Sequence, residues 1–244
     1  MSTGLKHSCQ EVIPATIIYN VEIKSLHHWQ VSIAQARHIQ LKLAKRVLRT
    51  GQVTSPNFIA GVDISANNAG GDATGAVVVL SYPELKPVEI RMAQGKLDYP
   101  YVPGFLSFRE APLALAACQQ LTVTPDLMVV DGQGIVHPQR IGLAAHIGLF
   151  LNTPTIGCAK SRLCGSFEMP DEESGSHTNL MEGGETIGAG LRTKSGVKPV
   201  YVSIGHKIDL QTALYWILAC CRSYRLPEST RLAHLAARGN LKPE

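Results

Sequence analysis

Residues 58–65, FIAGVDIS, and residues 127–134, LMVVDGQG, decide the fold of this 244-residue chain. Each begins as a short apolar run, and each run ends in an aspartate, Asp63 in the first and Asp131 in the second. Short apolar runs of this kind indicate buried strands. An acid at the end of a buried strand is costly unless it is solvated, paired or bound to a cation. If the two strands are neighbours in one sheet, their carboxylates gather at its edge, where α/β sheets bind ligands.

The segments around these two runs predict an α/β protein with a mixed central sheet. Helical periodicity covers residues 26–50, with basic residues beside a predicted apolar face of Ile33, Ala34, Ile39, Leu41, Leu43, Ala44, Val47 and Leu48. TGAVVVLSY (74–82) and PVEIRMAQGKL (87–97) join the first run in a three-stranded antiparallel meander, and helices then alternate with strands that we expect to be parallel. The order predicts three layers, with helices on both faces of the sheet. The later expected elements are helix 107–121, strand 125–132, helix 140–151, strand 153–160, loops and a short hairpin in 168–198, strand 199–206, helix 209–224 and helix 226–238.

Composition gives weaker constraints. The formal net charge is +4, from 23 Lys and Arg against 19 Asp and Glu, so overall charge is weak support for a nucleic-acid partner. The six cysteines form no CxxC pair, which indicates reduced thiols in a cytoplasmic protein and argues against a zinc site. We expect no membrane span and no signal peptide. We also expect a monomer, a loosely held extension over residues 1–24 and a single domain over residues 25–244.

Three carboxylates predict a metal site. Asp63 and Asp131 would meet at the strand ends, and Glu110, one turn into a predicted helix, would complete an oxygen site suited to Mg²⁺ or Mn²⁺. The alternative is that each aspartate only caps a turn. Glu110 has an alternative of its own, because Ser107 as N-cap with Glu110 three residues later has the spacing of a capping box.

Other polar residues near these strands are open to two interpretations. Lys160 ends the strand 153–160 and would point the same way as Asp131 if the two strands are parallel, or it is an ordinary solvated lysine. Gly132 and Gly134 would let the backbone approach a ligand closely, or they form an ordinary turn. His234, taken alone, is typical of a histidine on a helix surface.

The stretch YPYVPGFLSFREAP, residues 99–112, places rigid aromatic residues just before Glu110. Pro100 and Pro103 would stiffen the loop and hold Tyr101 out as a plate, and such a plate can stack on nucleic-acid bases or wedge between them. The alternative is a loop that faces the core and buries Tyr101 and Phe105.

Long blocks of the chain resemble endonuclease V, the deoxyinosine 3′-endonuclease family. The blocks are IAGVDIS, PYVPGFLSFRE, VVDGQGIVHPQRIGLAAHIGL, PTIGCAKSRLCG, GHKIDLQTAL and YRLPESTRLAH, in the family's order between about residues 58 and 237. The resemblance implies an RNase H-like fold. It also implies a nick at the second phosphodiester 3′ to deoxyinosine or another deaminated base, which leaves a 3′-hydroxyl, a 5′-phosphate and the base in place. Family members outside bacteria can prefer inosine in RNA.

The resemblance also implies residue roles. Asp63, Glu110 and Asp131 fall on the family's metal-binding carboxylates, with Mg²⁺ as the cofactor and Mn²⁺ as a substitute. Lys160 falls on an active-site lysine, and His234 falls on a position near the metal. Tyr101 falls on the tyrosine that fills the space left by the extruded base. The block residues expected around the lesion are Pro100, Pro103, Gly104, Leu106, Gly132 and His137. His206, in GHK, receives no role.

Two other functions remain open at this point. One is a different RNase H-like nuclease, acting on junctions, hybrids or RNA. The other is a non-catalytic nucleic-acid-binding module on the same fold, which a missing carboxylate would favour, although all three are present. An enzyme of phosphate metabolites would explain neither the aromatic loop nor the basic first helix.

Overall fold

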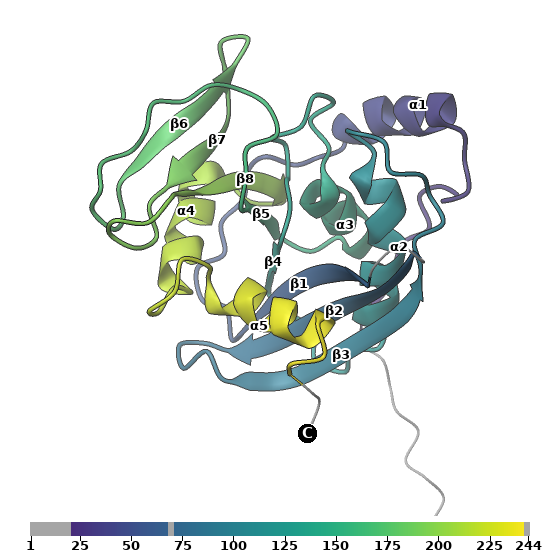
Figure 1. Ribbon diagram of the computed structural model, residues 1–244, viewed down its shortest axis with the longest axis horizontal. Helices are drawn as coiled ribbons and strands as arrows, with labels where there is room; N and C mark the ends of the chain where they lie inside the picture. Colours follow the sequence, from purple (N-terminus) through teal and green to yellow (C-terminus); the bar gives the residue numbers. More distant parts are fainter. Residues whose placement is uncertain (1–20, 68–70, 242–244) are drawn as a thin grey trace, which may run out of the picture.

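The computed structural model describes residues 21–67 and 71–241, and its strands form one mixed sheet of eight strands in the order β3-β2-β1-β4-β5-β8-β7-β6 (Figure 1). The strands and helices are β1 (Phe58–Asn67), β2 (Asp72–Ser81), β3 (Pro87–Lys96), β4 (Leu127–Val130), β5 (Thr155–Ala159), β6 (His177–Glu182), β7 (Glu185–Leu191), β8 (Val200–His206), α1 (Ile33–Ala44), α2 (Leu106–Cys118), α3 (Leu143–Leu151), α4 (Leu210–Ala219) and α5 (Glu228–Ala237).

The sheet confirms the predicted arrangement of its first five strands, whereas the expectation that strand 199–206 is parallel to the others was wrong, because β8 runs antiparallel to β5. β1, β2 and β3 form an antiparallel meander, and β4 and β5 follow in parallel with β1. The polar segment 168–198 contains the predicted hairpin, β6 and β7, which turns at Gly183 and Gly184 with φ values of +60° and +81°. Positive φ at both turn positions is what a tight hairpin turn requires, and glycine adopts it without steric cost. The hairpin extends the main sheet, because β7 pairs antiparallel with β8 and β8 pairs antiparallel with β5.

Helices cover both faces of the sheet, as the predicted three layers require (Figure 1). Side chains that alternate along β1 divide between two cores, because successive residues of a strand point to opposite faces. Ile59 packs in the core that includes residues of α4 and α5. Ala60 and Val62 pack in the core that includes residues of α2 and α3.

The first helix is shorter than the predicted 26–50. Ser32 begins it with a capping box, in which the Ser32 hydroxyl accepts from the Gln35 amide and the Gln35 side chain accepts from the Ser32 amide. The predicted apolar face was wrong in part, since Ile33 and Leu41 are about half exposed. Leu43 of the predicted face is buried, and with Ala36 and Gln40, which were not predicted, it forms a narrow buried stripe.

The predicted capping box at the start of the second helix was also wrong. Phe105 is the N-cap of α2, and Ser107 lies inside its first turn. The Ser107 hydroxyl is 3.0 Å from Nδ1 of the buried His146 on α3, so it has a tertiary partner in place of a helix amide. Glu110 is therefore not a capping residue.

Residues 1–20 of the predicted extension lie outside the described residues, but its last four do not. The Lys24 amide donates to the Phe150 carbonyl at 2.8 Å, and Val21 and Ile23 pack against the core beneath α2 and α3. The five cysteines that the structure describes are free. Among the described helices, none has the length and apolar character that crossing a membrane requires.

Candidate active site

Asp63 and Asp131 lie side by side, as their sequence positions predicted. Only Asp131 follows the end of its strand, however, because β1 continues past Asp63 to Asn67 and the prediction of a strand end at Asp63 was wrong. The last parallel pair between β1 and β4 is Val62 with Val130, so the next residue of each strand is an aspartate. The Asp131 amide donates to the Val62 carbonyl at 2.9 Å, which fixes the two chain segments at this edge. Asp63 is buried, with 7% of its surface exposed, and Asp131 is partly buried.

His234 reaches the aspartates from α5. Gly61 allows this helix to approach β1 closely, because a Cβ at residue 61 would lie 1.9 Å from the Ser229 carbonyl oxygen. His234 Nδ1 is hydrogen-bonded to Asp63 Oδ2 at 2.7 Å. The interpretation of His234 as a helix-surface residue without a partner is therefore wrong.

Glu110, on α2, brings a third carboxylate to the same cleft, although it is not among the three residues whose ligand atoms lie within 4.8 Å of one another. Burial, and then the negative charge of Asp63, raises the pKa of Glu110 to about 7. Burial, and then the charge of Asp131, raises the pKa of Asp63 to about 6, although the His234 hydrogen bond acts in the opposite direction. In the protein alone, the ionised forms of Asp63 and Glu110 are therefore both disfavoured.

The donor set fits a divalent cation. One ligand atom each from Asp63, Asp131 and His234 lies within 4.8 Å of the others. Carboxylate oxygens are the ligands that Mg²⁺ and Mn²⁺ prefer, and a cation would offset the burial and the repulsion that together raise the pKa values of Asp63 and Glu110.

Lys160 is the basic residue paired with this cluster. β5 runs parallel to β4, so Lys160 follows its strand on the same edge as Asp131, and Lys160 Nζ forms an ion pair with Asp131 Oδ2. Arg225 Nη2 donates to the Lys160 carbonyl at 2.9 Å and fixes the backbone there. Lys160 is exposed to solvent, but its ion pair with Asp131 makes it more than an ordinary solvated lysine.

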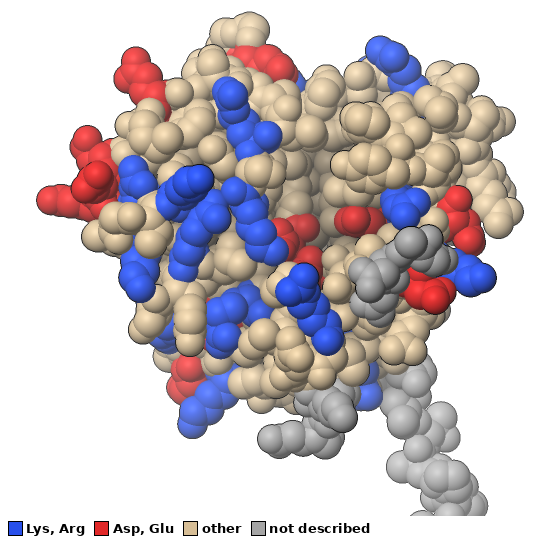
Figure 2. Space-filling view, viewed as in Figure 1, with Lys and Arg blue, Asp and Glu red and all other residues tan. Residues whose placement is uncertain are grey.

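A cleft of about 450 Å³ opens over these groups. Figure 2 shows acidic side chains at the floor of a hollow on this face, with Lys and Arg side chains gathered on the side of α4 and α5. The cleft brings together most of the residues predicted for the site, namely Asp63, Tyr101, Pro103, Gly104, Leu106, Glu110, Asp131, Gly132, His137 and Lys160. Pro100 lines a neighbouring cavity of about 730 Å³ instead.

The aromatic loop at the cleft mouth divides its rings between core and solvent. Tyr101 is 77% exposed, whereas Tyr99 is buried against Phe108 and Phe105 packs on the same cluster. Arg109 Nη1 donates to the carbonyls of Tyr99, at 2.6 Å, and Leu97, at 3.2 Å, and so holds the loop. The core-facing alternative is therefore wrong for Tyr101.

Gln40 belongs to the support of this site and was missed in the sequence. It is fully buried on α1, and its Nε2 donates to the Gly104 carbonyl at 2.7 Å. His137 Nε2 lies 2.9 Å from the same oxygen. The sequence signal that could have indicated Gln40 is its helical spacing from the apolar Ala36 and Leu43, which places a polar side chain on the buried side of the helix.

Three carboxylates, a lysine and a histidine at the edge of this sheet define a metal-dependent nuclease of the RNase H-like class. Residues 41–235 match the family model described as Endonuclease V. The chain belongs to the endonuclease V family. It is 47% identical over 218 residues to endonuclease V of Dehalococcoides mccartyi, a match that covers 89% of this chain and 98% of that protein.

Solved structures support the same placement and confirm the RNase H-like fold. The crystal structure of endonuclease V from Streptomyces avermitilis is 40% identical with a TM-score of 0.83, over 90% of this chain and 96% of that chain. Endonuclease V of Ciona intestinalis, crystallised with a 24mer DNA containing an inosine followed by a ribo-adenosine, is 28% identical with a TM-score of 0.74. That match covers 85% of this chain and 96% of that chain.

Proposed function

We propose that this chain is a deoxyinosine 3′-endonuclease of DNA repair that cuts at the second phosphodiester 3′ to the deaminated base. Water attacks the phosphorus and the 3′-oxygen leaves, so the products carry a 3′-hydroxyl and a 5′-phosphate. The cluster of Asp63, Glu110 and Asp131 beside Lys160, under an exposed Tyr101, carries this proposal. The inosine-containing DNA bound by the Ciona relative supports the choice of substrate.

We propose Mg²⁺ as the cofactor, with Mn²⁺ as a substitute, held by Asp63, Asp131 and Glu110. When bound, the ion would activate water and stabilise charge on the leaving oxygen. The His234 hydrogen bond would fix the orientation of the Asp63 carboxylate. Lys160 would stabilise negative charge on the phosphate that is cut.

Lesion selectivity would come from extrusion of the base. A mispaired hypoxanthine costs less to unstack than a paired base, and the exposed Tyr101 would fill the gap that it leaves. Pro100 and Pro103 would hold Tyr101 in place. The extruded base would enter the part of the cleft lined by Gly104, Leu106, Gly132 and His137.

We further propose that residues 25–244 form one domain that acts as a monomer in the cytoplasm. The single eight-stranded sheet supports one domain, and the free cysteines support a reducing compartment.

The test is a cleavage assay with a 5′-labelled duplex that carries one deoxyinosine. We expect a nick one nucleotide beyond the lesion with Mg²⁺ or Mn²⁺, no nick in EDTA and none in an unmodified duplex. Asp63→Ala and Asp131→Ala should abolish the nick, whereas Asp72→Ala, which removes an exposed carboxylate elsewhere on the sheet, should not. Cleavage of inosine RNA in preference to the duplex would overturn the DNA assignment, and wild-type rates in the aspartate variants would overturn the site.

A further inference from the structure

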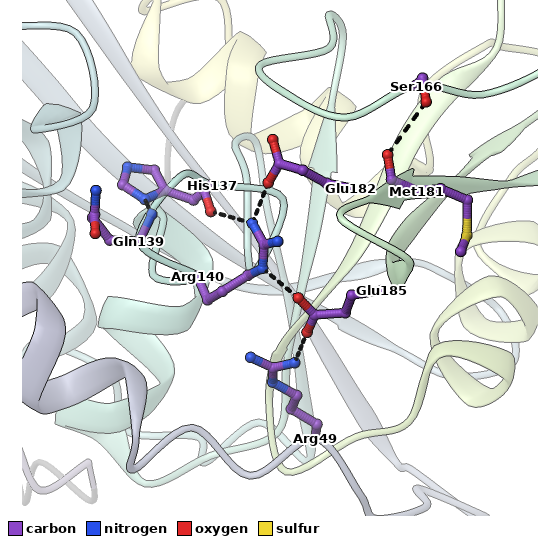
Figure 3. A network of polar contacts seen from close by, with 8 residues as sticks. All are labelled: Arg49, His137, Gln139, Arg140, Ser166, Met181, Glu182 and Glu185. Carbon is purple, nitrogen blue, oxygen red and sulfur yellow. Dashed lines mark hydrogen bonds and ion pairs between the residues drawn. The ribbon is translucent and has the colours of Figure 1, made fainter.

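Arg140, which lies outside the cleft, connects the β6–β7 hairpin to the loop after β4 (Figure 3). Its Nη1 donates to Glu182 Oε2 at 2.5 Å and its Nε donates to Glu185 Oε2 at 2.8 Å, so both ends of the hairpin turn hold one guanidinium. Arg49 forms an ion pair with the other oxygen of Glu185. The Arg140 side chain is 19% exposed, which makes these ion pairs less screened than those on an open surface.

The same guanidinium also holds the backbone of its own loop. Arg140 Nη1 donates to the His137 carbonyl at 2.9 Å, and the Arg140 amide donates to that carbonyl at 2.7 Å. Arg140 has a φ of +56°, a left-handed conformation that is unfavourable for a residue with a side chain. The ion pairs with the hairpin therefore help to maintain a backbone conformation that the loop alone would not favour.

This loop sets the position of a cleft residue. His137 Nδ1 accepts from the Gln139 amide at 3.1 Å, so the ring proton is on Nε2, which donates to the Gly104 carbonyl at 2.9 Å. Gly104 lies between Tyr101 and the start of α2, and both Gly104 and His137 line the cleft. Arg140, Glu182 and Glu185 do not line it.

We propose that Arg140, clamped by Glu182 and Glu185, is a positioning residue for lesion recognition: it fixes His137 and, through it, the Gly104 backbone of the loop that carries Tyr101. This inference rests on the proposed function. The contacts run toward the side of the cleft proposed to recognise the base, and the Arg140 side chain bonds to Glu182, Glu185 and the His137 carbonyl and not to Asp63 or Asp131. Loss of the clamp should therefore weaken selection of the deaminated base more than it slows bond cleavage.

The test compares Arg140→Ala and Arg140→Lys with Arg91→Ala. Arg91 is the matched control, because it pairs with Glu89 on the edge strand β3, away from the cleft. Binding of deoxyinosine and unmodified duplexes is measured in EDTA, and the nicking rate is measured in single turnovers at saturating enzyme. We expect Arg140→Ala to bind the deoxyinosine duplex about tenfold more weakly, with the unmodified duplex and the saturated nicking rate changed less than about twofold. Arg140→Lys should bind the deoxyinosine duplex almost as weakly as Arg140→Ala, because a lysine ammonium cannot reproduce the contacts of the planar guanidinium with Glu182 and Glu185.

Amide hydrogen exchange of the DNA-free protein tests the positioning itself. In Arg140→Ala the backbone amides of residues 139 and 140 and of the segment 101–106 should exchange faster than in wild type. Arg91→Ala should leave their exchange unchanged. Unaltered exchange in these segments, or an equal loss of binding to both duplexes, would overturn the inference. A wild-type protein that does not distinguish the two duplexes would instead contradict the proposed function, and the exchange result would still decide the positioning role.

Discussion

Replacing Glu110 with glutamine should make the metal-free protein more stable. Burial and the charge of Asp63 raise the Glu110 pKa from 4.5 to about 7, so its ionised form is disfavoured in the folded state. That change corresponds to about 3 kcal/mol, at about 1.4 kcal/mol for each tenfold change in proton affinity. Because water reaches the open cleft, we expect Glu110→Gln to raise the free energy of unfolding by about 2 kcal/mol at a pH of about 8.

The sign of the pH dependence follows from the same values. The unfolded chain ionises Glu110 above about 4.5 and the folded chain only above about 7, so the destabilisation grows between these values and is complete above about 7. The gain from Glu110→Gln should therefore nearly vanish at a pH of about 4.

Urea denaturation in EDTA measures both effects, with Glu84→Gln, at an exposed turn position, as the matched control. The melting temperature should rise by about 4 to 8 °C at the higher pH. Added Mg²⁺ should stabilise the wild type more than the variant, because the variant lacks one proposed ligand. Equal stability of the variant and the wild type at a pH of about 8 would refute the reasoning that the cluster is electrostatically strained without a cation.

Three further expectations concern binding and the support of the site. Tyr101→Ala should weaken binding to a deoxyinosine duplex by about tenfold in a titration and leave the saturated nicking rate within about threefold, because the ring is 77% exposed and has no place in the carboxylate cluster. The logarithm of the binding constant should fall linearly with the logarithm of salt concentration, as released counterions require, and a flat response would contradict contacts along the DNA backbone. Gly61→Ala should lower the free energy of unfolding by about 3 kcal/mol or more in urea, since its Cβ would lie 1.9 Å from the Ser229 carbonyl oxygen.

The sequence predicted most of the sheet because many of its strands are apolar runs that can be recognised without knowledge of the rest of the protein. Apolar runs such as 59–62 and 127–130 are buried in the sheet. The aspartate after the second run marks the end of β4, whereas β1 continues past Asp63 to Asn67 in its pairing with β2. Parallel pairing then places Asp63 beside Asp131 without further information. The strands were therefore found to within a few residues at their ends, whereas the first helix, predicted over 26–50, spans only Ile33–Ala44.

Features that depend on distant partners were not predictable in the same way. Ser107 has the spacing of an N-cap, and only the His146 ring from a different helix, 39 residues away, assigns its hydroxyl to another partner. The exposure of Ile33 and Leu41 depends on how little surface the rest of the protein offers to α1. Nothing near His234 in the sequence indicates Asp63, and the roles carried over from the resemblance to endonuclease V stay predictions until variants are assayed.

The His234 contact also has a consequence for the order in which the protein is made. His234 lies 171 residues after Asp63 along the chain, on a helix that packs directly against β1. A ribosome that has made the chain only to the end of β8 has already produced all three carboxylates and Lys160, but not the helix that brings His234 to Asp63. A nascent or truncated chain that ends before residue 228 therefore lacks the imidazole that is hydrogen-bonded to Asp63, and the group of Asp63, Asp131 and His234 is complete only after α5 has left the ribosome.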